Sequence, residues 1–177
     1  MPRPTVVPHD ACWSRLCQEE ADELAEIFGE EVVTIHHIGS TAIPGIYAKP
    51  IIDILVEVQD IARIDAFNRA MVERGYVPKG EFGIRGRRYF IKGTEERRTR
   101  HIHVFQTGDA EVERHLAFRD YLRVHPEEAR AYSRLKRDLV GRFPHDIESY
   151  MDGKNDWIKE TERKAKAWID REKKADT

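Results

Sequence analysis

A turn of small residues and one aspartate, each tied to an apolar segment, are the groups of this chain best suited to chemistry. Gly39, Ser40 and Thr41 directly follow an apolar run, and their amides and hydroxyls suit phosphate oxygens. Asp53 lies within a second run of Ile, Leu and Val, where a carboxylate is costly to bury without a partner. These four residues predict a phosphate-binding turn that faces an acid able to hold Mg²⁺. An ordinary turn, with Asp53 paired to a neighbouring Lys or Arg, would explain them equally well.

Two histidines offer further ligands for a metal. His101 and His103 are two residues apart in a run that continues into Val and Phe, which places both imidazoles on one face of a strand. With Asp53 they would give a divalent ion three protein ligands and an open position, with Zn²⁺ or Mn²⁺ favoured over Mg²⁺. We therefore predict Asp53, His101 and His103 as metal ligands, and Asp53 and His103 as catalytic residues. The alternatives are one histidine buried against a carbonyl with the other solvated, or both imidazoles binding phosphate or acting as acid or base.

A basic segment precedes the His-x-His run. Arg85, Arg87 and Lys92 flank an expected strand and are predicted to bind phosphate, because guanidinium groups pair well with phosphate oxygens. Nucleic acid is disfavoured as a partner, since the net charge is −2 and the isoelectric point is about 6.5. The expected partner is a nucleotide or another phosphorylated small molecule.

These stretches resemble the GrpB family (UPF0157) within the nucleotidyltransferase superfamily. The resemblance covers nearly the whole chain, in segments 37–58, 83–90, 101–104, 118–122 and 132–136 and at Tyr150 and Lys154. It implies a nucleotidyltransferase-like mixed β-sheet flanked by helices, whose C-terminal helices close a nucleotide cleft. It also implies that further residues face that cleft: Arg119, Asp120, Tyr132, Lys136 and Lys154.

One position departs from the superfamily pattern. Active nucleotidyltransferases usually carry a second carboxylate two residues after the first, and that position is Leu55 here. Glu57, the next residue on the same strand face, is about 13 Å from Asp53 along the strand, at ~3.3 Å per residue. A site with two metal ions is therefore not encoded in this strand.

Two functions from different classes follow. The first is a nucleotidyl or phosphoryl transferase that uses Asp53, a divalent metal and the turn at Gly39–Thr41. The second is a non-catalytic module that binds a nucleotide or phosphate ligand. The resemblance adds that some relatives are fused to dephospho-CoA kinase, which would suit an accessory role in coenzyme A metabolism.

Composition limits the class of protein. At 177 residues with 40% hydrophobic content, the chain is expected to form one domain. Cys12 and Cys17, on one predicted helix, are expected to be free thiols in the cytoplasm. The first ten residues hold three prolines and no apolar stretch, so we expect no signal peptide, and no run suggests a membrane span.

The predicted fold class is α+β. Strands are expected at 32–38, 51–58, 76–78, 88–92 and 101–105, and helices after Asp10, after Asp60, at 109–124, from Pro126, and at 154–173. Residues 1–106 would form the core and residues 107–177 a helical part packed on it.

Overall fold

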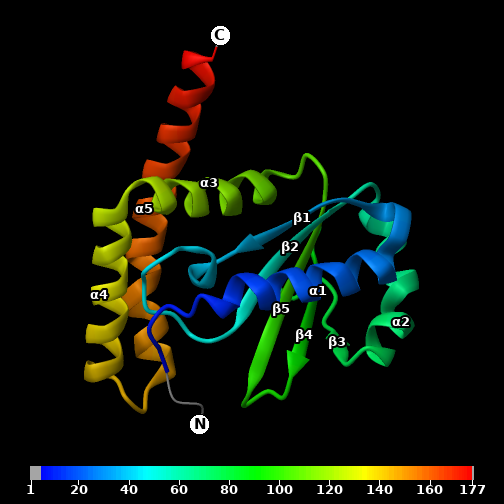
Figure 1. Cartoon of the computed structure of the whole chain (residues 1–177), viewed down its shortest axis with the longest axis horizontal. Coiled ribbons are helices and arrows are strands. Elements are labelled where there is room, and N and C mark those ends of the chain that lie inside the picture. The colour runs from blue at the N-terminus through cyan, green and yellow to red at the C-terminus, as the bar shows by residue number, and fades with distance from the viewer. Residues whose placement is uncertain (1–4, 177) are drawn as a thin grey trace.

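The computed structural model describes residues 5–176. Its helices and strands follow the expected order (Figure 1): α1 (Cys12–Phe28), η1 (Gly29–Glu31), β1 (Val32–Ile38), η2 (Ser40–Ala42), β2 (Ile52–Val58), η3 (Ile61–Phe67), α2 (Asn68–Glu73), β3 (Tyr76–Pro78), β4 (Arg88–Gly93), β5 (Arg98–Gln106), α3 (Ala110–Val124), α4 (Pro126–Arg142) and α5 (Ile147–Ala175).

The five strands form one mixed sheet in the order β1-β2-β5-β4-β3. Only the central pair, β2 with β5, is parallel, and the other neighbours are antiparallel. The predicted α+β class is thus confirmed. Every strand ends by Gln106, and the elements from Ala110 onward are helices.

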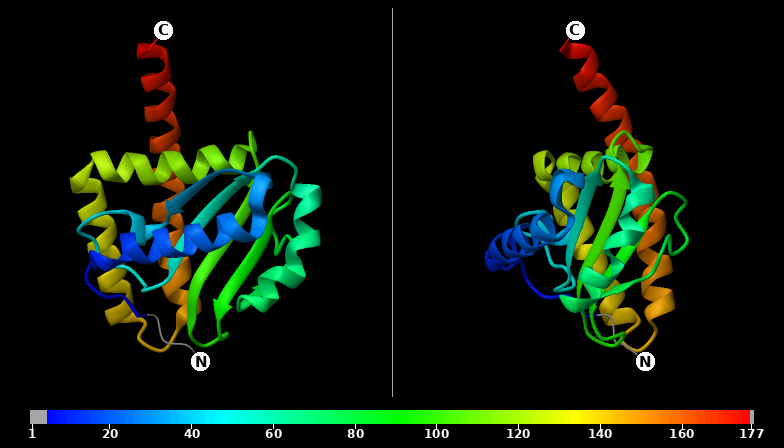
Figure 2. Two further views of the ribbon diagram at one scale, coloured as in Figure 1. Left: turned by 45° about the vertical axis from the view of Figure 1, so that its right-hand side comes forward. Right: turned by 90° about the vertical axis from the view of Figure 1, so that its right-hand side faces the viewer.

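Each face of the sheet is covered by different helices (Figure 2). One face packs against α1 and the η3–α2 segment, where Leu24, Phe28 and Met71 join Ile54 and Ile102 in the main core. The opposite face carries Leu55 and Phe105, which pack against Val112 of α3. Because side chains alternate along a strand, Asp53, two residues before Leu55, also belongs to this second face.

A second apolar cluster joins the helices to the loop before β2. Ile43 and Ile46 from that loop pack with Tyr121 of α3, Tyr132 of α4 and Ala165 of α5. The rings of Tyr132 and Trp157 stack with their centroids 4.5 Å apart. This cluster fixes the C-terminal helices beside the end of β2 where Asp53 lies.

The structure differs from the expected elements at two places. Residues Ile61–Phe67 are a 3₁₀ helix, which agrees with the three-residue spacing of Ile61, Ile64 and Phe67. Helix α5 begins at Ile147, well before Lys154, because the Asp146 side chain accepts a hydrogen bond from the Ser149 amide.

Helix α5 is also unusually long. Its first turns lie against α4 and its last turns extend beyond the rest of the molecule (Figures 1 and 2). None of the described helices is long and apolar enough to cross a membrane. Cys12 and Cys17 are free thiols, as expected.

Candidate functional site

The sheet brings Asp53, His101 and His103 together, as the sequence predicts. In the parallel pair, Asp53 is opposite His101 and Leu55 is opposite His103, so the two imidazoles lie on the same face as the carboxylate. Oδ1 of Asp53 is 3.3 Å from Nδ1 of His101 and 3.2 Å from Nε2 of His103. The three side chains form one cluster at the end of β2.

Arg87 determines which ring nitrogen of His103 carries the proton. Its Nη1 lies 3.1 Å from Nδ1 of His103, and its other nitrogens donate to the carbonyls of Glu81 and Phe82. A guanidinium only donates, so Nδ1 of His103 must accept and Nε2 must carry the proton that faces Asp53. Arg87 is buried and contacts His103 on the opposite side of the ring from Asp53. Its hydrogen bonds to the carbonyls of Glu81 and Phe82 hold the loop before β4 in place.

The charges of this cluster are set by burial and by hydrogen bonds. Burial alone would raise the pKa of Asp53, but hydrogen bonds from His101 and His103 outweigh it and hold that pKa well below its usual range. Burial lowers the pKa of His103, and the nearby Asp53 offsets this only in part. At neutral pH, Asp53 is a carboxylate beside a neutral His103.

The turn after β1 supports this carboxylate. Gly39 has φ +73°, and a Cβ there would lie 2.8 Å from Oδ2 of Asp53, so the glycine gives the backbone a close approach to Asp53 itself. The Thr41 hydroxyl lies 2.8 Å from Nε2 of His37. The Ser40 side chain lies close enough to Tyr132 to lower the pKa of that phenol in part, against the larger effect of burial, which raises it. The predicted turn is thus held from both sides.

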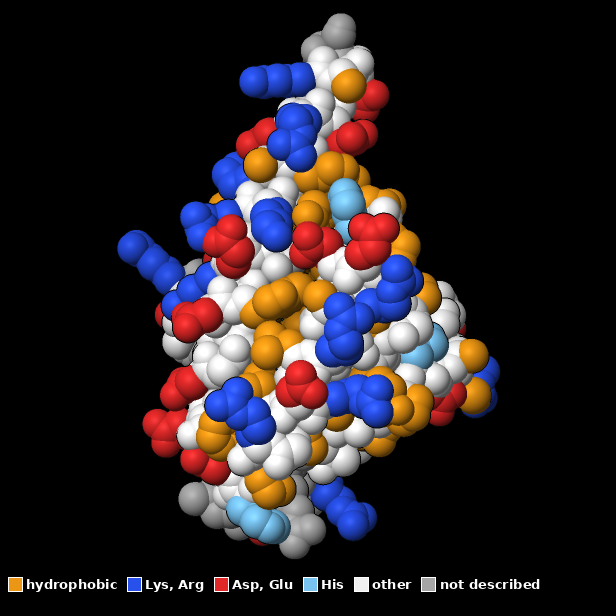
Figure 3. Space-filling model, turned by 90° about the vertical axis from the view of Figure 1, so that its left-hand side faces the viewer, with side chains coloured by type: hydrophobic (Ala, Val, Ile, Leu, Met, Phe, Trp, Pro, Cys, Tyr) orange, Lys and Arg blue, Asp and Glu red, His pale blue; other side chains and the backbone are white. Residues whose placement is uncertain are grey.

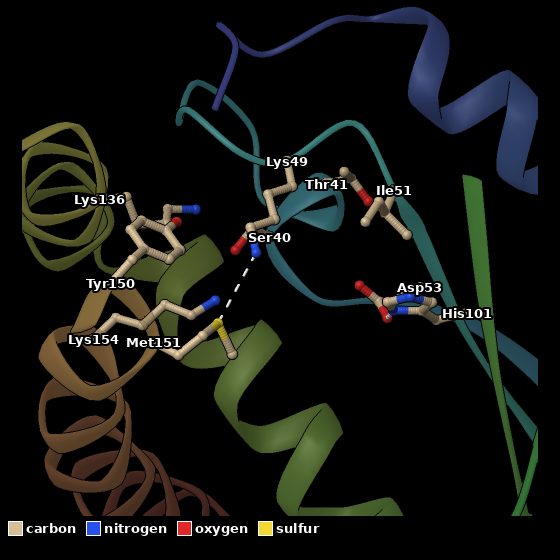
Figure 4. A pocket seen from close by; sticks show the side chains of 10 residues that line it. All are labelled: Ser40, Thr41, Lys49, Ile51, Asp53, His101, Lys136, Tyr150, Met151 and Lys154. Atoms are coloured by element: carbon tan, nitrogen blue, oxygen red, sulfur yellow. Dashed lines mark hydrogen bonds and ion pairs between the residues drawn. The ribbon is translucent and has the colours of Figure 1, made fainter. Parts of the chain in front are cut away.

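A cavity of about 240 Å³ opens between this end of the sheet and the C-terminal helices (Figure 4). The turn and the sheet contribute one wall and α4 and α5 contribute the other. The lining residues are Ser40, Thr41, Lys49, Ile51, Asp53, His101, Lys136, Tyr150, Met151 and Lys154. Helices α4 and α5 therefore form part of the wall of this cavity, and closure of a nucleotide cleft by them stays a prediction.

Three lysines dominate the chemistry of this cavity. Lys49 comes from the loop before β2, Lys136 from α4 and Lys154 from α5, and their ammonium groups point toward one another (Figure 4). We call this space, with its three lysines, the lysine cavity. Lys136 is only 2% exposed, and its Nζ has no hydrogen-bond partner within residues 5–176. Tyr150 is fully buried and its hydroxyl likewise lacks a partner there.

The pKa values of the lysines reflect this crowding. Burial, with repulsion from Lys154 and Lys49, lowers the pKa of Lys136 to about 7. Burial and repulsion from Lys49 lower the pKa of Lys154 to about 8, although Asp53 raises it in part. Burial lowers the pKa of Lys49 as well. Three cations face one carboxylate here, so the cavity lacks negative charge.

The predicted basic residues lie elsewhere. Arg85 is exposed in the loop before β4, and it does not line the cavity. Lys92 is on the opposite face of the sheet, where it pairs with Glu20 and Glu23 of α1. Arg87 is buried against His103. The prediction that Arg85, Arg87 and Lys92 form one phosphate site is therefore wrong, because the three side chains do not converge. Strand alternation sends Lys92 away from Asp53.

The cluster at Asp53 does not fit the three-ligand metal centre as it stands. Both nitrogens of His103 are engaged, and Nδ1 of His101 approaches the same Asp53 oxygen. Nε2 of His101 is buried without a partner among the described residues. Within residues 5–176, no three His, Cys, Asp or Glu side chains are arranged to hold an ion. Metal ligation by Asp53, His101 and His103 stays a prediction.

Leu55, at the position where active nucleotidyltransferases usually carry a second carboxylate, belongs to the core. Leu55 is fully buried with Ile38, Phe105 and Val112. Glu57 is directed to other partners, since its carboxylate lies 2.5 Å from Nε2 of His36 and accepts from the Thr107 hydroxyl. Neither position adds a carboxylate to the cavity.

Several cavity residues were not found from residue patterns. Lys136 and Lys154 were named only through the family resemblance, and Lys49, Tyr150 and Met151 were not singled out as cavity residues. Lys49 lies between the turn and Asp53 in the sequence. Its position as a lone lysine between these two predicted site elements could have indicated that it lines the cavity. Arg119 and Asp120, also suggested by the resemblance, pair with each other, and Arg119 donates to the carbonyl of His37.

Comparison with known proteins identifies the family. The model of the family described as "GrpB protein" matches residues 3–164. The chain belongs to the GrpB family. A crystal structure of the conserved protein GrpB from Enterococcus faecalis is similar to it with a TM-score of 0.88 and 41% identity, over 93% of this chain and 99% of that one.

Relatives of this GrpB protein differ in length. The UPF0157 protein YqkA of Bacillus subtilis is 47% identical over 92% of this chain, which spans only 47% of that relative. The glutamate-rich protein GrpB of Alkalihalophilus pseudofirmus is 37% identical, over 88% of this chain and 91% of its own length. A dephospho-CoA kinase of Mycolicibacterium paratuberculosis is 26% identical over 93% of this chain, which spans 46% of it.

Proposed function

We propose that this GrpB protein binds a nucleotide or another phosphorylated small molecule in the lysine cavity. The observation that supports this most strongly is the Nζ of Lys136, which is buried without a hydrogen-bond partner among the described residues. A buried ammonium group is costly unless an anion or a set of acceptors compensates it. Lys49 and Lys154 lie beside it in the same cavity, and a phosphate would neutralise the group of lysines together.

The size and surroundings of the cavity favour a small ligand. Its volume of about 240 Å³ is somewhat below the usual range of about 300–1,000 Å³ for ligand pockets. Positive and negative side chains alternate over the face of the molecule shown in Figure 3, so that face offers no broad basic surface for nucleic acid.

The dephospho-CoA kinases among the relatives suggest one ligand to include. The names of these relatives guide only the choice of probes, since this chain spans less than half of the length of each of them. A role as an accessory module that binds coenzyme A or its precursor agrees with the lysine cavity, because both molecules carry phosphate groups.

A second candidate is transfer of a nucleotidyl or phosphoryl group. Asp53 supports it, since this carboxylate lies in the same cavity as the lysines and the Ser40–Thr41 turn. Its test is release of pyrophosphate or phosphate from each nucleoside triphosphate with Mg²⁺, Mn²⁺ or Zn²⁺. Turnover that is lost in Asp53→Asn would favour transfer, and binding without turnover would favour the module.

A thermal-shift screen tests the binding proposal. The probes are inorganic phosphate, nucleoside mono-, di- and triphosphates, coenzyme A and dephospho-CoA, each with and without divalent metal. A ligand bound only by the folded state must raise the melting temperature. We expect a rise for at least one phosphorylated probe and a smaller rise in Lys136→Met than in Lys159→Met, an exposed residue on α5 outside the cavity. No rise with any probe would reject the proposal.

A further inference from the structure

We infer that the lysine cavity takes a phosphate monoester dianion directly on the ammonium groups of Lys49, Lys136 and Lys154, without a bridging metal ion. This rests on the proposed function and names its ligand class. The relevant contrast is with a phosphodiester, which has one charge, and with a triphosphate, which ordinarily arrives with its own divalent metal.

The balance of charge points to a dianion. The cavity is lined by three lysines and by one carboxylate, Asp53. Once all three lysines are protonated, its wall has two excess positive charges, before any charge on His101. A phosphate monoester has a charge of about −1.5 to −2 at pH 7 and offers three terminal oxygens. A dianion would leave this buried space close to neutral.

The donors match those oxygens in number and character. Lys136 Nζ and the Tyr150 hydroxyl are both buried and unpartnered among the described residues. The Nζ atoms of Lys49 and Lys154 both lie near the Tyr150 ring, 5.0 Å and 5.3 Å from its centroid. Ammonium groups bind phosphate as point charges and accept varied geometry. A single terminal phosphate can therefore engage all of them.

Direct binding needs no metal in this arrangement. The cluster beside the cavity has its imidazoles turned onto Asp53 Oδ1, so the lysines are the cavity's main source of positive charge. A metal-bound triphosphate would place a further cation among these three lysines. The lysine wall would then oppose the metal instead of cooperating with it.

Binding should also take up a proton. Lys136 faces Tyr132 on its own helix, Lys154 and Tyr150 on α5, and Lys49 on the loop before β2, and the nearest carboxylate in the cavity is Asp53. Burial, with repulsion from the other two lysines, lowers its pKa to about 7, so part of the population is neutral at pH 7.5. A dianion favours the protonated amine, and complex formation should therefore draw a proton from the buffer.

Isothermal titration with EDTA present tests the ligand class. The matched probes are adenosine 5′-monophosphate against the cyclic 3′,5′-diester, and coenzyme A against dephospho-CoA, which lacks its 3′-phosphate monoester. Inorganic phosphate shows whether the phosphate alone suffices. We expect at least one monoester of a pair to bind about tenfold or more tightly than its partner, as for loss of a charged hydrogen-bonding group.

Variants at position 136 assign the effect to the cavity. Lys136→Met should weaken monoester binding by about tenfold or more. Lys136→Arg should retain binding but reduce the proton uptake, measured at pH 7.5 in buffers with different ionisation enthalpies, because arginine does not titrate and only Lys154, with a pKa of about 8, would still take up a proton. Lys154→Met gives a second variant in case the first disturbs folding, and Lys159→Met is the surface control.

The outcomes separate this inference from the function on which it rests. Binding that requires a divalent metal, or equal affinity for monoester and diester, would overturn the inference while leaving phosphate binding intact. Unchanged affinity in both Lys136→Met and Lys154→Met would also overturn it, because the ligand would then lie elsewhere. Absence of binding by every phosphorylated probe would reject the proposed function as well.

Discussion

The backbone of Gly39 lies directly against the carboxylate of Asp53. A Cβ at position 39 would fall 2.8 Å from Oδ2, and the φ of +73° is one that other residues rarely adopt. The turn after β1 and the acid of β2 are therefore fitted to each other across the antiparallel pair, in which Ile38 is opposite Asp53.

Gly39→Ala should destabilise the protein and displace Asp53. We expect a loss of about 1–3 kcal/mol from backbone strain alone, with more from the contact with the carboxylate. Gly45→Ala is the matched control, because Gly45 also has a positive φ but has open space around its Cβ position. Chemical denaturation measures both, and an equal loss in the two variants would contradict the contact with Asp53.

Arg87→Met should release His103. In the wild type we expect an Nε2–H tautomer for His103, because Arg87 donates to Nδ1. The variant should raise the pKa of His103, since the positive charge of Arg87 helps to lower it. Nitrogen chemical shifts of the imidazole, followed by NMR as a function of pH, report both quantities. A wild-type His103 protonated on Nδ1 would rule out this arrangement.

Lys136→Met should raise the free energy of unfolding at pH 7. The pKa of Lys136 is about 7 in the folded state and 10.5 as its ordinary value, so between these values the unfolded chain binds more protons. Wild-type stability should therefore rise with pH across this window, and the variant should show a flatter curve. Denaturant melts from pH 6.5 to 9.5, without phosphate, test this against Lys159→Met. A less stable variant would show that the amine has a compensating partner.

Acid should unfold the protein partly through two half-buried histidines, His37 and His115. Burial lowers the pKa of His37 to about 4 and that of His115 to about 3, from an ordinary value of 6.5. Between pH 6.5 and these values the unfolded state holds more protons, so stability falls as the pH drops. His115→Phe should reduce this slope, as measured by the melting temperature from pH 7 to 4.5. The depressed pKa of Asp53 adds a loss only below its ordinary value of 3.8.

Leu55→Asp should destabilise the fold and should not create a second metal ligand. Leu55 is fully buried between the sheet and α3, and an unpaired carboxylate there should cost about 3 kcal/mol or more. Leu55→Met, which keeps volume and polarity, should cost less than about 1.5 kcal/mol. Denaturation of both variants with and without Mg²⁺ is the measurement. Stabilisation of the aspartate variant by Mg²⁺ would contradict the assignment of Leu55 to the core.

The sequence predicted the sheet and the meeting of Asp53 with the histidines for identifiable reasons. Apolar alternation and turn glycines mark strands locally, and the two-residue spacing of His101 and His103 fixes their shared face. The position of Lys92 was misjudged because proximity to a strand was considered without its alternation: Lys92 points to Glu20 on α1.

The lysine cavity could not be predicted in this way. Lys136 and Lys154 come from two successive helices, and Lys49 comes from a loop much earlier in the chain, so no local spacing connects the three. Lys136 also looks like an ordinary charged residue on a helix, and only packing shows that it is buried. The start of α5 was missed because its cap, Asp146, follows a turn and precedes a polar stretch that includes Gly153.

The parallel pairing of β2 with β5 has a consequence for the order in which the site is built. Asp53 and His103 are 50 residues apart, with β3 and β4 between them in the chain. The β1–β2 hairpin can form early from nearby residues, but the β2–β5 pairing must wait for a long loop to close. Throughout that delay Asp53 lacks the imidazoles that hold its charge, so its carboxylate should titrate near the ordinary value until β5 docks. Below pH 3.8, where the two values give different protonation, the protonation state of Asp53 would then report the final step of folding.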